Sequence, residues 1–272
     1  MSSQKPQLEQ TKSMEEGIKK AMGLVDYRIV VFSGKGGVGK TTVSVNLAYA
    51  LTKRGKRVGL LDADITGPNV PQMVGIAESL EADTERILPH EKDGVKIVSL
   101  ASMVPPEVAI IWRGPLRSKA IEQLLGDAKW GTLDFLIIDL PPGTGDEVLT
   151  IAQRTSPQMA IVVTTPQEVA LIDARRAVNM AKKMEIRQIG VVENMSGLVC
   201  PHCGERIDLF GIDGGRRDAL RLGVRFLGAI PIDPNVRVGA DVGQPILLAN
   251  PHADASQAFL SIAARVEEIL VK

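Results

Sequence analysis

The sequence has few aromatic residues and no excess of either charge. Phenylalanine, tryptophan and tyrosine make up 3% of the 272 residues, so aliphatic side chains must dominate the core. The chain has 32 basic and 32 acidic side chains, which give a formal net charge of zero. Because a neutral chain lacks the long-range field that attracts phosphate backbones, we expect no nucleic-acid partner.

Long hydrophobic runs are also missing. No stretch approaches the roughly 18 apolar residues of a membrane-spanning helix. Residues 1–20 are polar and contain no apolar segment of the kind that secretory signals carry. The sequence therefore predicts a cytoplasmic protein with no membrane partner.

The chain has only two cysteines, Cys200 and Cys203, three positions apart. One close pair is no disulfide framework, and in a reducing compartment this spacing indicates metal or redox chemistry. Two thiolates from one turn suit an iron–sulfur cluster or zinc. From these residues alone, three interpretations stay open: an iron–sulfur site, a structural zinc knuckle and a redox dithiol.

From residue 27 onward, short apolar segments alternate with segments of helical periodicity. Several apolar segments are almost continuous in Val, Ile and Leu, which is typical of parallel strands covered on both faces. The predicted strands are 28–33, 57–62, 95–100, 135–140, 159–164, 189–193 and 225–230. The predicted helices are 40–53, 115–128, 167–184, 214–222 and 255–271. This alternation predicts an α/β fold in which a doubly wound, mostly parallel sheet carries helices on both faces.

Neither an internal repeat nor a Pro/Gly-rich linker divides the chain, so we expect one domain over residues 27–272. Residues 1–26 have few apolar side chains and are expected to form a flexible N-terminal arm, with a short amphipathic helix around Met14–Met22. The last predicted helix has an apolar face, but Glu267 and Glu268 lie where a lipid-surface helix would be basic. We expect this helix to pack on the sheet.

A phosphate-binding motif follows the first predicted strand. Residues 34–42 have the sequence GKGGVGKTT, which satisfies G-x-x-x-x-G-K-[ST] between a strand and a helix. Glycines let backbone N–H groups turn toward phosphate oxygens, and the helix N-terminus adds positive charge. Lys40 is expected to reach the β- and γ-phosphates of ATP, and the Thr41 hydroxyl to bind Mg²⁺. The expected nucleotide-binding residues of the loop are Gly34, Lys35, Gly36, Gly37, Val38, Gly39, Lys40, Thr41 and Thr42.

Two acidic segments lie at the ends of predicted strands, where an open α/β sheet has its ligand crevice. Asp62 and Asp64 end the second predicted strand, and Asp139 lies near the end of the strand 135–140. Asp139 looks like a Walker B aspartate, so we expect it to hold Mg²⁺ or its water shell. Acids at these positions also suit helix N-caps, which is the alternative structural role.

Lys35 is a second lysine inside the phosphate loop. The form KGGVGKTT resembles the deviant Walker A motif of MinD, ParA and the nitrogenase iron protein. This resemblance implies that Lys35 reaches across a dimer to the partner's nucleotide and acts in catalysis together with Lys40. It also implies that Asp64 orients the water that attacks the γ-phosphate. A solvated loop lysine is the alternative for Lys35.

Further segments resemble the Mrp/ApbC family of iron–sulfur cluster carrier ATPases over about residues 27–270. They have the sequences DADITGP at 62–68, WRGP at 112–115, DLPPGTGD at 139–146, ENM at 193–195, CPHCG at 200–204 and IPIDP at 230–234. The resemblance implies a SIMIBI-class P-loop ATPase in which Asn194 contacts the adenine base and Pro231 and Asp233 flank it. The segment after Asp139 would be a switch that responds to the γ-phosphate.

For Cys200 and Cys203, the family resemblance favours iron–sulfur chemistry. One chain supplies two thiolates and a cubane usually takes four, so a symmetric homodimer would share one [4Fe–4S] cluster. The sequence thus predicts an ATP hydrolase that uses ATP and Mg²⁺, carries a labile cluster and transfers it to apo-proteins. The rival hypothesis is a positioning switch like MinD or ParA with a structural zinc knuckle. An electron-donating reductase is a third possibility.

Overall fold

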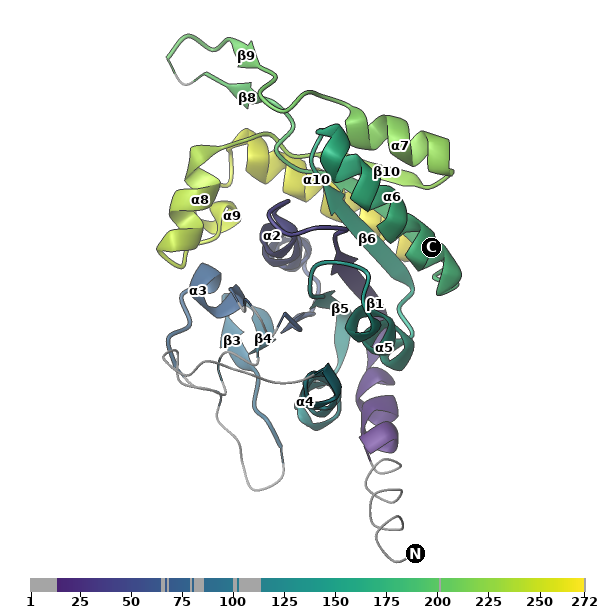
Figure 1. Cartoon of the computed structure of the whole chain (residues 1–272). Coiled ribbons are helices and arrows are strands. Elements are labelled where there is room, and N and C mark those ends of the chain that lie inside the picture. The colour runs from purple at the N-terminus through teal and green to yellow at the C-terminus, as the bar shows by residue number, and fades with distance from the viewer. Residues whose placement is uncertain are drawn as a thin grey trace, which may run out of the picture.

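The computed structural model describes residues 14–64, 67, 69–78, 80, 86–99, 102, 114–200 and 202–271. Eight strands from these residues form one sheet in the order β10-β7-β6-β1-β5-β2-β4-β3 (Figure 1). All neighbouring strands are parallel except β3 and β4, which are antiparallel at one edge. The prediction of a doubly wound, mostly parallel sheet is confirmed.

The elements follow the predicted alternation closely. The strands of the sheet are β1 Val25–Phe32, β2 Val58–Asp62, β3 His90–Lys92, β4 Val95–Ser99, β5 Leu133–Asp139, β6 Met159–Thr164, β7 Gln188–Glu193 and β10 Arg225–Ala229. A separate hairpin pairs β8 Leu198–Val199 with β9 Arg206–Ile207. The helices are α2 Lys40–Lys53, α3 Val70–Val74, α4 Gly114–Asp127, α5 Asp146–Thr155, α6 Glu168–Lys183, α7 Gly214–Leu222, α8 Pro234–Asp241, α9 Ile246–Ala249 and α10 Asp254–Leu270. Every predicted strand and helix is present.

Alternate residues of the central strands face two separate apolar layers. In β1, Val30 and Phe32 point to one side and Ile29 and Val31 to the other, and all four are completely buried. The first layer is covered by α4, α5, α6, α7 and the helix at residues 14–22. The second is covered by α2, α3, α9 and α10. Burial on both faces explains why these strands are apolar throughout rather than alternating.

The short helix expected around Met14–Met22 is present, but it is packed into the core and is not part of a flexible arm. Residues 14–22 form a helix whose Ile18 and Met22 are 4% and 6% exposed within the first apolar layer. A Cβ atom on Gly126 of α4 would lie 3.3 Å from Ile18, so the glycine lets the two helices approach. These residues therefore pack on the sheet instead of belonging to a loose arm. Residues 1–13 lie outside the described residues, as do Trp112 and Arg113.

The C-terminal helix packs on the sheet, as predicted. Phe259, Ile262 and Val266 of α10 are buried in the second apolar layer. On its polar face, the Glu267 carboxylate forms ion pairs with Arg54 and Lys56, each with a nitrogen–oxygen distance of 2.7 Å. These pairs hold α10 against the end of α2. Among the described residues, no helix is long and apolar enough to cross a membrane.

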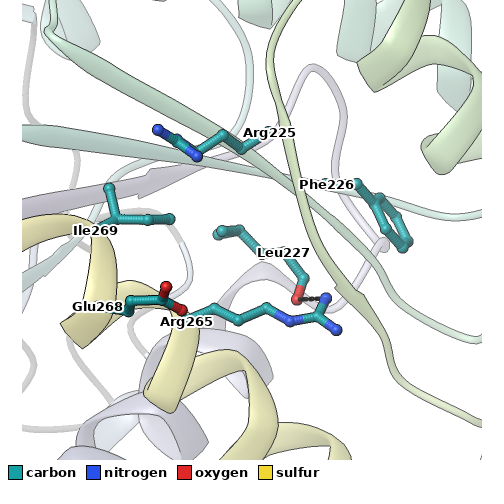
Figure 2. A pocket seen from close by; sticks show the side chains of 6 residues that line it. All are labelled: Arg225, Phe226, Leu227, Arg265, Glu268 and Ile269. Carbon is teal, nitrogen blue, oxygen red and sulfur yellow. Dashed lines mark hydrogen bonds between the residues drawn. The ribbon is translucent and has the colours of Figure 1, made fainter.

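The sheet ends at β10, and α10 covers part of that edge. Arg265 donates a hydrogen bond of 2.8 Å to the carbonyl oxygen of Leu227, and both residues line a hollow of about 230 Å³ (Figure 2). An edge strand presents unpaired backbone groups that can pair with other chains. The Arg265 guanidinium satisfies one of these groups from within the chain.

Candidate nucleotide and thiol sites

A cavity of about 770 Å³ lies at the carboxyl edge of the parallel strands. Its lining includes nine of the residues expected to bind nucleotide, namely Gly36, Gly37, Gly39, Lys40, Thr41, Thr42, Asn194, Pro231 and Asp233. Asp64 also lines it, whereas Gly34, Lys35 and Val38 do not. The topology thus brings together loop residues and side chains that lie about 200 positions apart in the sequence.

The glycines of the phosphate loop differ in what they make possible. At Gly36 and Gly37 an added Cβ would meet no atom within 4 Å, so the backbone is open to a ligand. Gly39 has a φ of 84° and caps the start of α2, and a Cβ there would lie 2.1 Å from the side-chain nitrogen of Asn194. A Cβ at Gly34 would lie 2.2 Å from the backbone oxygen of Asp173 in α6. Two of these glycines therefore permit close packing, and two leave the loop accessible.

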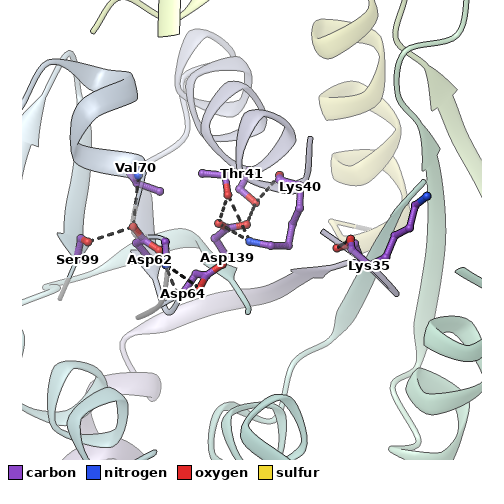
Figure 3. A network of polar contacts seen from close by, with 11 residues as sticks. Lys35, Lys40, Thr41, Asp62, Asp64, Val70, Ser99 and Asp139 are labelled. Atoms are coloured by element: carbon purple, nitrogen blue, oxygen red, sulfur yellow. Dashed lines mark hydrogen bonds and ion pairs between the residues drawn. The ribbon is translucent and has the colours of Figure 1, made fainter. Parts of the chain in front are cut away.

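Lys40 and Thr41 on the first turn of α2 converge on Asp139 at the end of β5 (Figure 3). Ser44, one turn further along α2, contacts the same carboxylate. Asp139 Oδ2 lies 2.7 Å from Lys40 Nζ and accepts a hydrogen bond of 2.8 Å from the Thr41 hydroxyl. Its Oδ1 accepts one of 2.6 Å from Ser44. Asp139 is completely buried and Lys40 is 6% exposed, so each charge needs the other for compensation.

A second buried carboxylate, Asp62, lies beside this cluster. Asp62 and Asp139 are register partners on the neighbouring strands β2 and β5. Asp62 accepts hydrogen bonds from the Ser99 hydroxyl at 3.1 Å, from the backbone N–H of Val70 at 3.3 Å and from that of Asp64 at 3.2 Å. Burial, followed by the nearby charge of Asp139, raises the pKa of Asp62 to about 7.

These contacts let Asp62 position the segment that carries Asp64. The Asp64 side chain is 8% exposed, lines the cavity, and accepts a hydrogen bond of 3.3 Å from the backbone of Gly67. The acids at the end of β2 therefore have different roles: Asp62 anchors the backbone, and Asp64 faces the cavity. Residues 65, 66 and 68 lie outside the described residues.

Lys35 is separated from the other loop lysine. Its side chain is half-buried and directed away from the Lys40–Asp139 cluster (Figure 3). Its carbonyl oxygen accepts a hydrogen bond of 2.8 Å from the Ser33 hydroxyl, which stabilises the turn of the loop. Within one chain, Lys35 and Lys40 therefore do not face the same phosphate position.

The opposite wall of the cavity follows β7 and β10. Asn194 donates a side-chain hydrogen bond of 2.9 Å to the carbonyl oxygen of Val38, so it contacts the phosphate loop directly. Pro231 and Asp233 line the cavity after β10, and Asp233 caps α8 by accepting a hydrogen bond of 2.8 Å from the backbone of Asn235. The apolar side chains of this wall include Met195, Phe210, Ile230 and Ile232, and pockets for organic ligands are lined mostly by such groups.

The two cysteines lie on the β8–β9 hairpin, which extends away from the sheet (Figure 1). Cys200 is half-buried and Cys203 is exposed, and both are free thiols. Hydrogen bonds from the backbone of Cys203 and His202, and from the Cys203 side chain, lower the pKa of Cys200. A lowered pKa favours the thiolate that binds metals. Pro201 lies outside the described residues.

The described part of the chain offers no further ligand to this pair. Among those residues, no group of three or more His, Cys, Asp and Glu side chains is placed to hold a metal ion. His202 beside the cysteines is exposed on the hairpin. The hairpin therefore presents two thiols to the outside, which is half of a four-thiolate site.

Several residues of the site were not predicted from the sequence. Ser44 lies four positions after Lys40 on α2, and this helical spacing is a signal for its contact with Asp139. The anchoring role of Asp62 depends on Ser99 of β4, and no local pattern indicates it. Leu209 and Phe210, which follow the hairpin, also line the cavity without a sequence signal.

Comparison with known proteins gives consistent matches over nearly the whole chain. The family model described as ParA, NUBPL iron-transfer P-loop NTPase, matches residues 24–267. The chain is 51% identical over 268 residues to an iron–sulfur cluster carrier protein of Pyrococcus horikoshii, covering 94% of this chain and 90% of that one.

Two solved structures have the same fold. A nucleotide-binding protein of Archaeoglobus fulgidus in complex with ADP, with cobalt found in it, is 37% identical with a TM-score of 0.78, and the match covers 90% of this chain and 96% of that one. The cell division ATPase MinD of Pyrococcus furiosus is 26% identical with a TM-score of 0.67, and here the match covers 90% and 99%.

Proposed function

Because the chain belongs to the ParA family of NUBPL iron-transfer P-loop NTPases, we propose that it is an ATP-dependent carrier of iron–sulfur clusters. In this proposal two copies hold one labile [4Fe–4S] cluster between their Cys200–Cys203 hairpins and deliver it to apo-proteins. The observation that carries it is a pair of free thiols, one half-buried and one exposed, on the hairpin of a P-loop NTPase fold, with no further ligand in the described part of the chain. A second copy supplies the missing two thiolates.

ATP is the substrate that binds in the cavity. The open backbone of the phosphate loop and the N-terminus of α2 favour its phosphate groups. Thr41 and Asp139 would hold Mg²⁺, because their side-chain oxygens lie 2.8 Å apart and Mg²⁺ prefers oxygen ligands. A bound Mg²⁺ would supply positive charge that neutralises the charge developing on the phosphate groups. Asn194, which also contacts the phosphate loop, and Pro231 contact the adenine base.

In hydrolysis, Asp64 orients the attacking water from its position in the cavity lining. Asp62 supports this role, since it accepts the backbone N–H of Asp64 and fixes the start of α3. Lys40 moves from Asp139 toward the transferring phosphate. Lys35 acts on the partner's nucleotide, which agrees with its direction away from its own Lys40.

Cluster transfer proceeds by exchange of thiolate ligands. One thiolate of the acceptor forms a bond to iron as the bond from Cys203 or Cys200 breaks, so ligand number and electron count are conserved. Val199, Ile207 and Leu209 on and beside the hairpin are 48%, 43% and 59% exposed. These side chains offer an apolar surface to the second copy and to the acceptor.

We also propose a cytoplasmic location, because two free surface thiols are suited to a reducing compartment. The rival hypothesis of a MinD-like positioning switch has weaker support. The chain is 51% identical to a named cluster carrier and 26% identical to a MinD. In addition, α10 buries its apolar face within the chain and so leaves no amphipathic surface for lipid.

The proposal is tested by transfer of cluster to an apo-protein that requires [4Fe–4S]. Cys200→Ala and Cys203→Ala should each abolish transfer while ATP still binds, because neither cysteine is part of the cavity lining. His202→Ala is the matched control, since it changes an exposed residue of the same turn and should leave transfer intact. Wild-type transfer rates in either cysteine variant would contradict the proposed role of the hairpin.

A further inference from the structure

The cysteine hairpin is rooted in the wall of the nucleotide cavity. Met195 lies just before the hairpin, and Leu209 and Phe210 lie just after it, and all three line the cavity. The hairpin is therefore not attached to a separate part of the fold. The chain segments on both sides of it belong to the surface of the nucleotide cavity. A displacement of that wall must therefore also displace Cys200 and Cys203.

The segments on either side of the hairpin, residues 194–197 and 209–215, are called its two roots. Glu193 at the end of β7 links them. It is completely buried, and its carboxyl oxygen Oε1 accepts hydrogen bonds from the Ser196 hydroxyl at 2.6 Å and the Asp213 backbone N–H at 3.0 Å. Oε2 accepts one of 2.6 Å from the backbone N–H of Gly215. Ser196 precedes the hairpin, whereas Asp213 and Gly215 follow it. One side chain thus fastens both ends of the segment 196–213.

The start of α7 is built to receive this carboxylate. A Cβ on Gly215 would lie 3.2 Å from both Cβ and Oε2 of Glu193, which is tighter than ordinary contact, so the glycine permits the approach. The N-terminus of a helix also favours a negative group. A buried carboxylate with three short hydrogen bonds is costly to move, and it defines one arrangement of the roots.

The next residue along the chain connects this clamp to the phosphate loop. Asn194 donates to the carbonyl oxygen of Val38, and its side chain packs directly against Gly39. On the other side, the backbone N–H of Ser196 donates to Ile230 at 2.9 Å, and that of Ile232 donates to Gly197 at 2.7 Å. The first root therefore touches the phosphate loop at one end and the base-binding segment at the other.

We infer that Glu193 is a positioning residue that couples nucleotide binding in the cavity to the geometry of the cysteine hairpin. Nucleotide displaces Asn194 and the segment 230–232, and Glu193 transmits this displacement to both hairpin roots together. The inference rests on the proposed function only for the identity of the cargo. The coupling itself is a property of the thiols and the nucleotide.

The chain provides a specific probe, because Cys200 and Cys203 are its only cysteines. The experiment measures the rate at which the reduced, cluster-free full-length protein reacts with a disulfide reagent such as dithiobis(nitrobenzoate). Rates are compared without nucleotide and with Mg²⁺ and a non-hydrolysable ATP analogue. Wild-type protein should show a change of at least about fivefold, the lower range of allosteric coupling.

Glu193→Gln should bind the analogue within about twofold of wild-type affinity and lose most of the change in thiol reactivity. Ser196→Ala removes one bond of the clamp and should give an intermediate response; it carries the test if Glu193→Gln does not fold. Asp218→Asn is the matched control, because Asp218 is a buried carboxylate of α7 whose side chain pairs with Arg175 of α6. It should retain the full response.

Three results would overturn the inference. The first is that nucleotide leaves the rate of thiol modification unchanged in the wild type, and the second is that it changes this rate in folded Glu193→Gln as much as in the wild type. The third is that Asp218→Asn loses as much of this nucleotide-dependent change as Glu193→Gln does. A merely structural Glu193 would lower thermal stability without changing the ratio of the two rates. Failure of the proposed carrier function would look different. Wild-type protein would then take up no cluster, but its thiol reactivity would still change with nucleotide.

Discussion

The ammonium group of Lys40 lies 2.7 Å from the carboxylate of Asp139, and water is almost completely excluded from the pair. The same carboxylate also accepts the hydroxyls of Thr41 and Ser44. In a buried ion pair each charge offsets the cost of removing the other from water, so removal of one partner leaves a buried charge without its counter-charge. These four side chains consequently link the stability of the fold to the residues that we propose bind phosphate and Mg²⁺.

Lys40→Met should abolish ATP hydrolysis and lower the free energy of unfolding by about 3 kcal/mol, since Asp139 loses its buried cation. Urea unfolding and a phosphate-release assay check both effects. The double variant Lys40→Met/Asp139→Asn should recover most of the stability but none of the hydrolysis. An unchanged free energy of unfolding in Lys40→Met would mean that the pair does not compensate as described.

Asp64→Asn should bind ATP normally and slow hydrolysis by about 100-fold, because only the orientation of the attacking water is affected. Single-turnover hydrolysis and nucleotide affinity are measured side by side. Asp241→Asn is the matched control, since Asp241 lines the same cavity but is exposed on α8. If Asp64→Asn turns over at the wild-type rate, another group orients the water.

Lys35→Ala should reduce hydrolysis without loss of ATP binding, because its side chain is not part of the cavity lining in its own chain. Mixing Lys35→Ala with Lys40→Ala chains should restore activity. In a mixed dimer one site combines an intact Lys40 with the partner's intact Lys35, so random mixing gives roughly a quarter of wild-type activity. Verified mixed dimers without activity would exclude a role for Lys35 across the interface.

The raised pKa of Asp62 predicts a pH dependence of stability. Its pKa is about 7 in the folded chain and 3.8 as the reference value, because burial and Asp139 disfavour the charged form while Lys40 partly opposes them. The protonated acid thus contributes stability that is fully present below about pH 4 and is lost as pH rises to about 7. Asp62→Asn should remove this slope in metal-free and nucleotide-free protein.

The measurement compares free energies of unfolding from pH 5 to pH 8. Relative to wild type, Asp62→Asn should become more stable as pH rises. Glu91→Gln, a change at a side chain that is 71% exposed, is the control and should leave the profile unchanged. A parallel shift of the whole Asp62→Asn curve would show that burial does not hold the acid in its protonated form.

Much of the fold was predictable because its information is local. The strands of a covered parallel sheet are buried throughout, as β2 and β6 are, and the resulting runs of mostly apolar residues make them recognisable in the sequence. The phosphate loop is also continuous, so nine adjacent residues sufficed to identify it. The family resemblance drawn from the dispersed motifs is confirmed by the family model.

The remaining features depend on contacts between distant segments. The short helices α3 and α9 have too few residues for a periodic pattern, and their positions follow from neighbouring elements. The burial of Ile18 depends on Gly126, more than 100 residues later. Glu193 was noticed only as part of a family motif, and its contacts with both hairpin roots required the three-dimensional structure.

The central claim is that two copies of the chain share one cluster through Cys200 and Cys203. The most direct measurement is the content of iron, sulfide and zinc per dimer after anaerobic reconstitution, with the dimer verified by its mass in solution. Wild-type protein should be brown and contain about four irons and four sulfides per dimer, whereas Cys200→Ala and Cys203→Ala should contain none. Colourless wild-type protein with one tightly bound zinc per dimer would contradict it.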